Sequence, residues 1–138
     1  MGFFENLFRK KVEIEVHDPV FGVLSFAHGI WTHVPREPNA GFMVTVDAPE
    51  SGPTDRQRDF FQSIRANLPD FEHRANDFIR RCVDESLPLL SVYSVEIGTD
   101  DETGRQEFVL ELSDDDAHEI HRVQFRAGEP VDYDGFED

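Results

Sequence analysis

Cysteine is almost absent from this chain, since Cys82 is the only one. A single cysteine excludes a disulfide within the chain and a zinc site made of several thiolates. No run of about 18 apolar residues is present, so no segment resembles a transmembrane helix. The first residues lack the small-residue cleavage site of a secretory signal. We therefore expect a cytoplasmic protein with no stable membrane insertion.

Catalytic signatures are also missing. The sequence has no Gly-x-Ser-x-Gly elbow, no glycine-rich phosphate loop and no dinucleotide fingerprint. Cys82 falls within an apolar helical pattern, whereas a reactive thiol needs a positioned base and an accessible site. We expect Cys82 to be a small core residue. The sequence therefore favours a protein that is not an enzyme and that needs no cofactor.

Acidic residues dominate the charge, and they gather at one end of the chain. The formal net charge is −16, of which −12 falls on residues 86–138. Such a field repels nucleic-acid phosphates and speeds encounter with a basic protein. The simpler alternative is that the charge only maintains solubility. The charge thus argues against nucleic acid as a partner and leaves a basic protein as the candidate.

The first part of the sequence predicts a β-meander. Residues 12–17 alternate apolar and polar side chains, as a half-buried strand does. Further strands are expected at residues 22–27, 30–33 and 41–47. Asp18-Pro19 is typical of a turn between the first two strands. Trp31 is expected to anchor this sheet against the helices that follow.

Two consecutive helices are predicted after the meander. Thr54 and Gln57 have the spacing of a capping box, which places a helix start after Thr54. Pro69 ends this helix and can begin the next one, because proline is tolerated in a first helical turn. The second helix shows an apolar stripe with a period of about 3.6 residues, formed by Phe71, Ala75, Phe78, Ile79, Cys82 and Val83.

The remaining sequence returns to strands, at residues 89–98, 107–113 and 118–125, and residues 131–138 are expected to form a short edge strand or a tail. The side chains expected on the core face are Tyr93, Val95 and Ile97, followed by Phe108, Leu110 and Leu112. The order of elements predicts an α+β fold, a mainly antiparallel sheet with two consecutive helices packed on one face. We expect a single domain over residues 12–138, preceded by a short amphipathic helix or tail over residues 1–11.

An acidic surface follows from this arrangement. If the apolar residues of the hairpin face the core, Glu96, Glu107 and Glu111 share the exposed face. Like charges across a strand pair are unfavourable, so such a face either tolerates repulsion in water or receives cations from a partner. With the corner that follows, the predicted partner-binding residues are Glu96, Glu107, Glu111, Asp114, Asp115 and Asp116.

Two other functions stay open. A small metal-dependent or carboxylate-based hydrolase could use His17, His28 and His33 if the meander brings them together. A membrane-surface adaptor could use the N-terminal residues 1–11, in which an apolar stripe is followed by three cations. His118 and His121 are a further candidate pair of metal ligands. A strand would place their two imidazoles on opposite faces, which argues against a shared metal ion.

Three stretches carry a family resemblance: DPVFGVLSF with a following tryptophan, GPTDRQRDFFQSI at a helix start, and HRVQFRAGEPVDYDGFED at the end. In these the chain resembles small uncharacterised bacterial domains with a D-x-x-F-G-x-L opening, over roughly residues 12–138. The resemblance implies a cytosolic immunity-type protein that blocks a secreted polymorphic toxin by binding it. The shared motifs are structural, so it implies no catalytic or ligand-binding residue.

Overall fold

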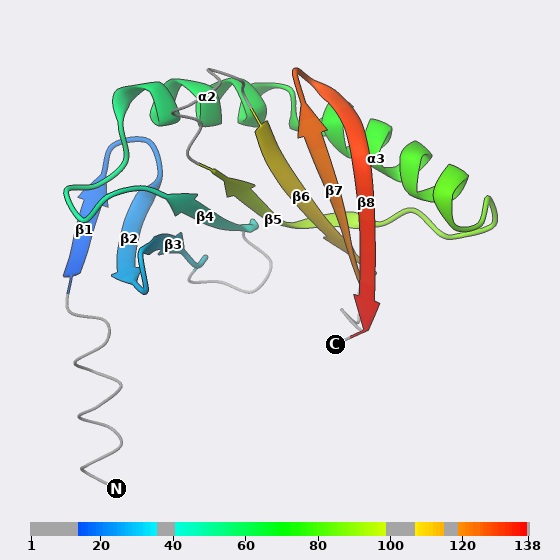
Figure 1. Ribbon diagram of the computed structural model, residues 1–138, viewed down its shortest axis with the longest axis horizontal. Helices are drawn as coiled ribbons and strands as arrows, with labels where there is room; N and C mark the ends of the chain where they lie inside the picture. Colours follow the sequence, from blue (N-terminus) through cyan, green and yellow to red (C-terminus); the bar gives the residue numbers. More distant parts are fainter. Residues whose placement is uncertain (1–13, 36–40, 99–106, 115–118, 138) are drawn as a thin grey trace, which may run out of the picture.

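The described chain runs through four strands, two helices and four more strands, which confirms the predicted α+β class (Figure 1). The computed structural model describes residues 14–35, 41–98, 107–114 and 119–137. Its elements are β1 (Ile14–Asp18), β2 (Gly22–Ala27), β3 (Ile30–His33), β4 (Met43–Asp47), α2 (Asp55–Ala66), α3 (Leu68–Cys82), β5 (Ser91–Ile97), β6 (Glu107–Ser113), β7 (Glu119–Arg126) and β8 (Glu129–Glu137). The expected N-terminal helix over residues 1–11 lies outside these ranges.

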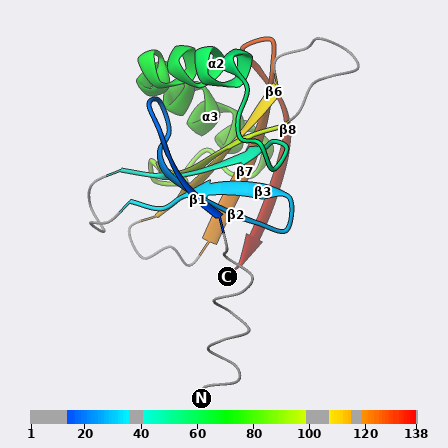
Figure 2. The ribbon, with the colours of Figure 1, turned by 90° about the vertical axis from the view of Figure 1, so that its left-hand side faces the viewer.

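All eight strands form one sheet, in which spatial order follows chain order from β1 to β8. Neighbouring strands are antiparallel except β4 and β5, which run parallel. The two helices lie in this connection, because a parallel pair needs a long crossover. Figure 2 shows both helices on the same side of the sheet. The predicted mainly antiparallel sheet with helices on one face is confirmed.

The start of α2 is held by the predicted capping box. Gln57 N donates to Thr54 Oγ1 at 3.1 Å, and Thr54 N donates to Gln57 Oε1 at 3.0 Å. Gln57 Nε2 also donates to the carbonyl of Asp47 at 2.9 Å. One side chain therefore caps the helix and ties it to the end of β4.

The core lies between the helices and the covered sheet face. Trp31 is fully buried, as predicted, and its Nε1 donates to the carbonyl of Pro49 at 2.9 Å. Phe71 of α3 packs edge-on against the stacked rings of Phe108 and Phe125, with centroids 5.1 and 5.4 Å away. The alternation of β6 toward this core is also as predicted.

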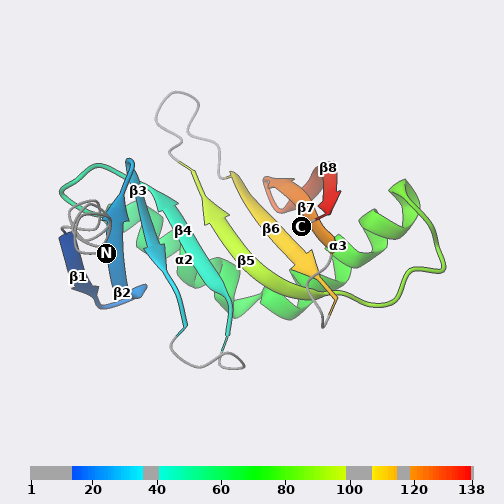
Figure 3. The same ribbon diagram turned by 90° about the horizontal axis from the view of Figure 1, so that it is seen from below.

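Two expected core residues are exposed instead. Tyr93 is 40% exposed, because the β5–β6 register shifts between Val92 and Ser94 and Val92 takes the core-facing position. Cys82, the last residue of α3, is also exposed. Figure 3 shows that this end of the helix extends past strand β8, so it has no sheet to pack on. Both predictions were wrong for reasons of local geometry.

Candidate functional site on the open sheet face

One face of the sheet is left open by the helices. In the view of Figure 3 the strands lie in front and both helices lie behind them. Within the described ranges, no helix covers the near face. Side chains that alternate away from the core along β3 to β8 therefore meet on this surface, which we call the open face.

The predicted glutamates Glu96, Glu107 and Glu111 do lie together on the open face. Their strands β5 and β6 pair antiparallel, with Glu96 opposite Val109 and Ser94 opposite Glu111. They are less exposed than expected, however. The side chains of Glu96 and Glu107 are 31% and 34% exposed, and that of Glu111 is only 13% exposed.

Arg122 of β7 covers two of these carboxylates, those of Glu96 and Glu111. Its guanidinium donates to both carboxylate oxygens of Glu96, at 2.9 and 2.7 Å, and lies 3.3 Å from Glu111. The hydroxyl of buried Ser94 donates to the other oxygen of Glu111 at 2.6 Å. The hydrogen bonds with Glu96 are the largest cause that raises the pKa of Arg122 above its ordinary value, so this guanidinium stays charged.

Glu107 has a cation of its own. Arg126 Nε donates to Glu107 Oε1 at 2.8 Å, and Gln124 Nε2 lies 3.4 Å from the other oxygen. The expectation for these like charges was either repulsion tolerated in water or cations supplied by a partner. The chain itself supplies two arginines, which the sequence does not reveal because the register of β7 against β6 is set only by the fold. Arg122 and Arg126 are four residues apart, a spacing that puts both on one face of a strand.

The open face stays acidic after these ion pairs are counted. Asp132 lies opposite Gln124 and Asp134 opposite Arg122, so β8 adds two exposed carboxylates to this face. Strands β4 to β8 place two arginines on it, Arg122 and Arg126. Glu129 lies opposite Arg126, but its carboxylate pairs with Arg74 of α3. Six further carboxylates lie on the open face: Asp47, Glu96, Glu107, Glu111, Asp132 and Asp134. By contrast, helices α2 and α3 carry five acids and six arginines.

The other three acids predicted to bind a partner are not seen on the open face that the described residues form. Asp114 directly follows β6, is partly buried and interacts with other residues of the chain. Asp115 and Asp116 lie outside the described residues. The structure therefore places three of the six predicted residues on one surface and puts the fourth at the end of the strand.

A hollow of about 330 Å³ opens on this face, near the ends of β4 and β5. Apolar Ile30, Phe108 and Val109 form part of its wall, and Asp47, Glu96 and Glu107 form part of its polar lining. A space of this size can take a side chain or a small ligand. It gives the acidic face a recess as well as a charge.

The three histidines of the meander do not form a site. His17 lies on the opposite face of β1 from core-facing Val16, and His28 lies in the β2–β3 turn with φ of 54°. His33 shares a face with Trp31 and bonds through Nδ1 with the carbonyl of Val23 at 2.9 Å. In the part of the chain that the structure describes, no three His, Cys, Asp or Glu residues are grouped to hold a metal.

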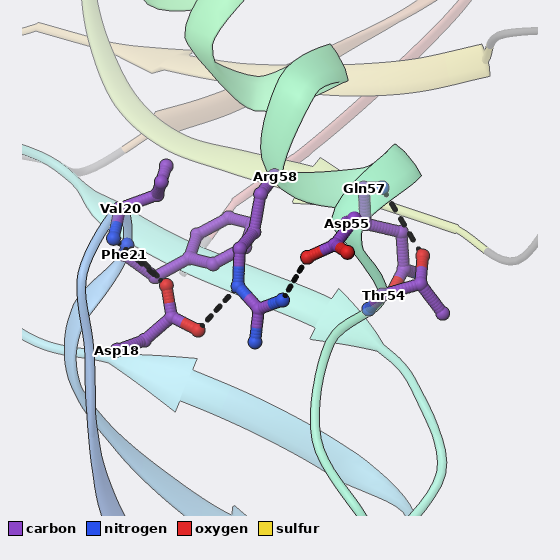
Figure 4. Close-up of polar contacts among 7 residues, drawn as sticks. All are labelled: Asp18, Val20, Phe21, Thr54, Asp55, Gln57 and Arg58. Carbon is purple, nitrogen blue, oxygen red and sulfur yellow. Dashed lines mark hydrogen bonds and ion pairs between the residues drawn. The ribbon is translucent and has the colours of Figure 1, made fainter.

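Asp18 is a buried carboxylate beside the turn between β1 and β2 (Figure 4). Burial would raise the pKa of Asp18, but hydrogen bonds from the Phe21 amide, Arg58 and the Val20 amide outweigh it and lower the pKa below its ordinary value. Arg58 Nε donates to Asp18 Oδ2 at 2.8 Å and its Nη1 donates to Asp55 at 2.8 Å. The predicted turn is thus confirmed, and its aspartate also ties β1 to α2. All its bonds are internal, so its role is structural.

His121 of β7 is a buried histidine on the covered face of the sheet. His121 is 5% exposed, bonds through Nδ1 with the hydroxyl of Tyr133 at 2.7 Å and lies 3.5 Å from Glu119 through Nε2. Burial is the largest cause that raises the pKa of Tyr133, followed by the charge of Glu119. A Cβ on Gly135 would clash with the Tyr133 hydroxyl, so glycine leaves the space in which this phenol reaches His121.

Comparisons with protein-family models, with curated proteins and with solved structures gave no match. Among the described residues, neither helix is both long and apolar enough to cross a membrane. The class of the protein is therefore described by its fold and its surface alone. The protein is an α+β protein with an eight-stranded sheet, a helix pair on one face and an acidic open face.

Proposed function

We propose that the protein is a non-enzymatic binding module that docks a basic protein on its open face. The observation that carries this proposal is the charge asymmetry between the two sides of the sheet. Among the described residues, and apart from Glu129, which pairs with α3, strands β4 to β8 place six carboxylates and two arginines on the open face, whereas helices α2 and α3 carry five acids and six arginines. Charge needed only for solubility has no reason to favour the uncovered face.

The internal arginines suit a binding surface. Arg122 holds Glu96 and Glu111 in fixed positions, so a partner would not have to order these side chains on docking. A network with more acids than cations still attracts a basic surface and gives it a preferred orientation. Exposed Asp132 and Asp134 lie at the rim, where charges chiefly affect the rate of association and its salt dependence.

The finer proposal is an immunity-type inhibitor that neutralises a basic toxin, such as a nuclease, by covering its cationic surface. The acidic open face supports it, and an immunity-type protein is also what the sequence resemblance implies. A nucleic-acid-cleaving toxin carries positive charge where it holds phosphates, which is the complement of this face.

Proteins encoded in reading frames beside the gene are the first partners to test. Each would be purified and its binding to the full chain measured at about 50 and 300 mM salt. We expect a basic neighbour to bind, with affinity that falls at high salt. The triple variant Glu107→Gln, Asp132→Asn, Asp134→Asn should weaken binding at least about tenfold.

The matched control is Asp59→Asn with Glu85→Gln, exposed acids of α2 and of the α3–β5 connection. The control should bind like the unaltered protein. Binding that is insensitive to salt and to the triple variant would overturn the open-face proposal, as would the absence of any basic partner among the neighbours.

A further inference from the structure

Strand β8 ends the sheet, and its outer edge has no strand partner among the described residues. Its first half is a poor template for pairing, because Pro130 lacks an N–H and the register shifts near Val131. From Asp132 to Glu137 every residue pairs in regular register with β7. A six-residue stretch of regular edge is long enough to accept another strand.

The side chains of this edge differ between the two faces. Asp132 and Asp134 lie on the open face, opposite Gln124 and Arg122. Asp132 Oδ1 accepts a hydrogen bond from the Tyr133 N–H at 2.9 Å, which a carbonyl of an added strand would have to replace. Tyr133 lies on the other face and packs partly against the core. Alternate residues of a strand are about 6.8 Å apart on one face, so the edge presents two carboxylates at that repeat.

We propose that the edge of β8 takes up an extended segment of a basic protein as an added strand. Lysine or arginine at alternate positions of that segment would face Asp132 and Asp134, and apolar residues between them would lie on the Tyr133 side. The inference rests on the proposed function for the basic nature of the partner, and it names how part of that partner is held. A second copy of this chain fits poorly, because it would bring the same aspartates against these.

The probe is a capped eight-residue peptide of alternating lysine and valine, titrated into the isotope-labelled full chain and followed by backbone NMR. The control peptide has the same sequence but is N-methylated at one central lysine and at the valine beside it. This removes one N–H from each edge of the peptide and keeps its charge, so it separates strand pairing from simple attraction.

The unmethylated peptide should bind at least about tenfold more tightly than the methylated one, because the latter cannot form an uninterrupted ladder. The backbone chemical-shift changes that the unmethylated peptide causes in the protein should centre on β8, and the exchange of the β8 amide hydrogens with solvent should slow. Asp132→Asn with Asp134→Asn should weaken binding several-fold, whereas Asp59→Asn with Glu85→Gln should not.

Three results would overturn strand pairing: equal affinity of the two peptides, shift changes centred away from β8, or no binding of either peptide. None of them contradicts the open-face proposal, which is tested with a whole partner protein and includes Glu107. Conversely, the peptide could pair with β8 while no basic protein encoded beside the gene binds the chain. That result would support strand pairing at the β8 edge and overturn the proposed function.

Discussion

Arg122 holds Glu96 through two parallel hydrogen bonds, at 2.9 and 2.7 Å, across the open face of the sheet. The same guanidinium lies 3.3 Å from Glu111, so one cation neutralises part of a two-carboxylate site. This arrangement explains how acidic side chains on neighbouring strands are tolerated within the fold. It also leaves the face with surplus negative charge.

Removing the shared cation should therefore be costly. Arg122→Gln leaves the partly buried carboxylates of Glu96 and Glu111 without their shared cation, and we expect the free energy of unfolding to fall by about 2–3 kcal/mol. Urea unfolding at pH 7 measures this. Arg126→Gln breaks a single, more exposed pair with Glu107 and should cost about 1 kcal/mol or less. Equal losses in the two variants would contradict the shared-cation account.

The stability should also depend on the Asp18 carboxylate. Its pKa is lower in the folded than in the unfolded protein, so its contribution is fully present above the unfolded pKa of about 3.9. The contribution is lost as the pH falls through the folded pKa. At pH 7, Asp18→Asn should cost about 1–3 kcal/mol through the weakened bond to Arg58.

Chemical unfolding of Asp18→Asn and of the unaltered protein over a pH series tests this sign. The difference between them should shrink from pH 5 downward. A difference that stays constant down to pH 2 would show that the charge of Asp18 has no part in holding the turn. Asp55→Asn is the control, since its pair with Arg58 is exposed and should change stability by less than about 0.5 kcal/mol.

The exposed thiol of Cys82 should react in the native protein. We expect one equivalent of a thiol reagent to be taken up without denaturant, at a rate close to that of the unfolded chain. Cys82→Ser should abolish the reaction and change the free energy of unfolding by less than about 0.5 kcal/mol. Reaction that occurs only after unfolding would place the thiol in the core.

Gly135 should be required for the contact between Tyr133 and His121. In Gly135→Ala the new methyl group would displace the Tyr133 hydroxyl and break its 2.7 Å bond, at a cost of about 1–2 kcal/mol. A double-mutant cycle with Tyr133→Phe measures the coupling. The alanine should cost clearly less in the Tyr133→Phe background, and strictly additive losses would contradict the role of glycine.

Local patterns predicted much of the fold. The Thr54–Gln57 capping box and the alternation of Phe108, Leu110 and Leu112 depend on neighbours along the chain, and both are confirmed. Tyr93 was misplaced because a register shift between Val92 and Ser94 reverses the alternation, and no residue type marks it. Cys82 was misplaced because periodicity does not show where a helix runs beyond its sheet.

The candidate site was predictable only in part. Alternation placed Glu96, Glu107 and Glu111 on one face, where the structure also has them. Glu96 and Glu111 are paired with Arg122, which reaches them only through the register of β6 against β7. Such pairing between distant segments follows from the tertiary fold and not from any local motif.

The central claim is that a basic partner covers the open face and leaves the helix layer free. Carboxyl-group footprinting of the protein, alone and in complex with a basic neighbour, reads the relevant side chains directly by mass spectrometry. The account predicts loss of labelling at Asp132, Asp134 and Glu107, with Asp59 and Glu85 labelled as before. Protection of Asp59 and Glu85 with Asp132 and Asp134 still fully labelled would contradict it.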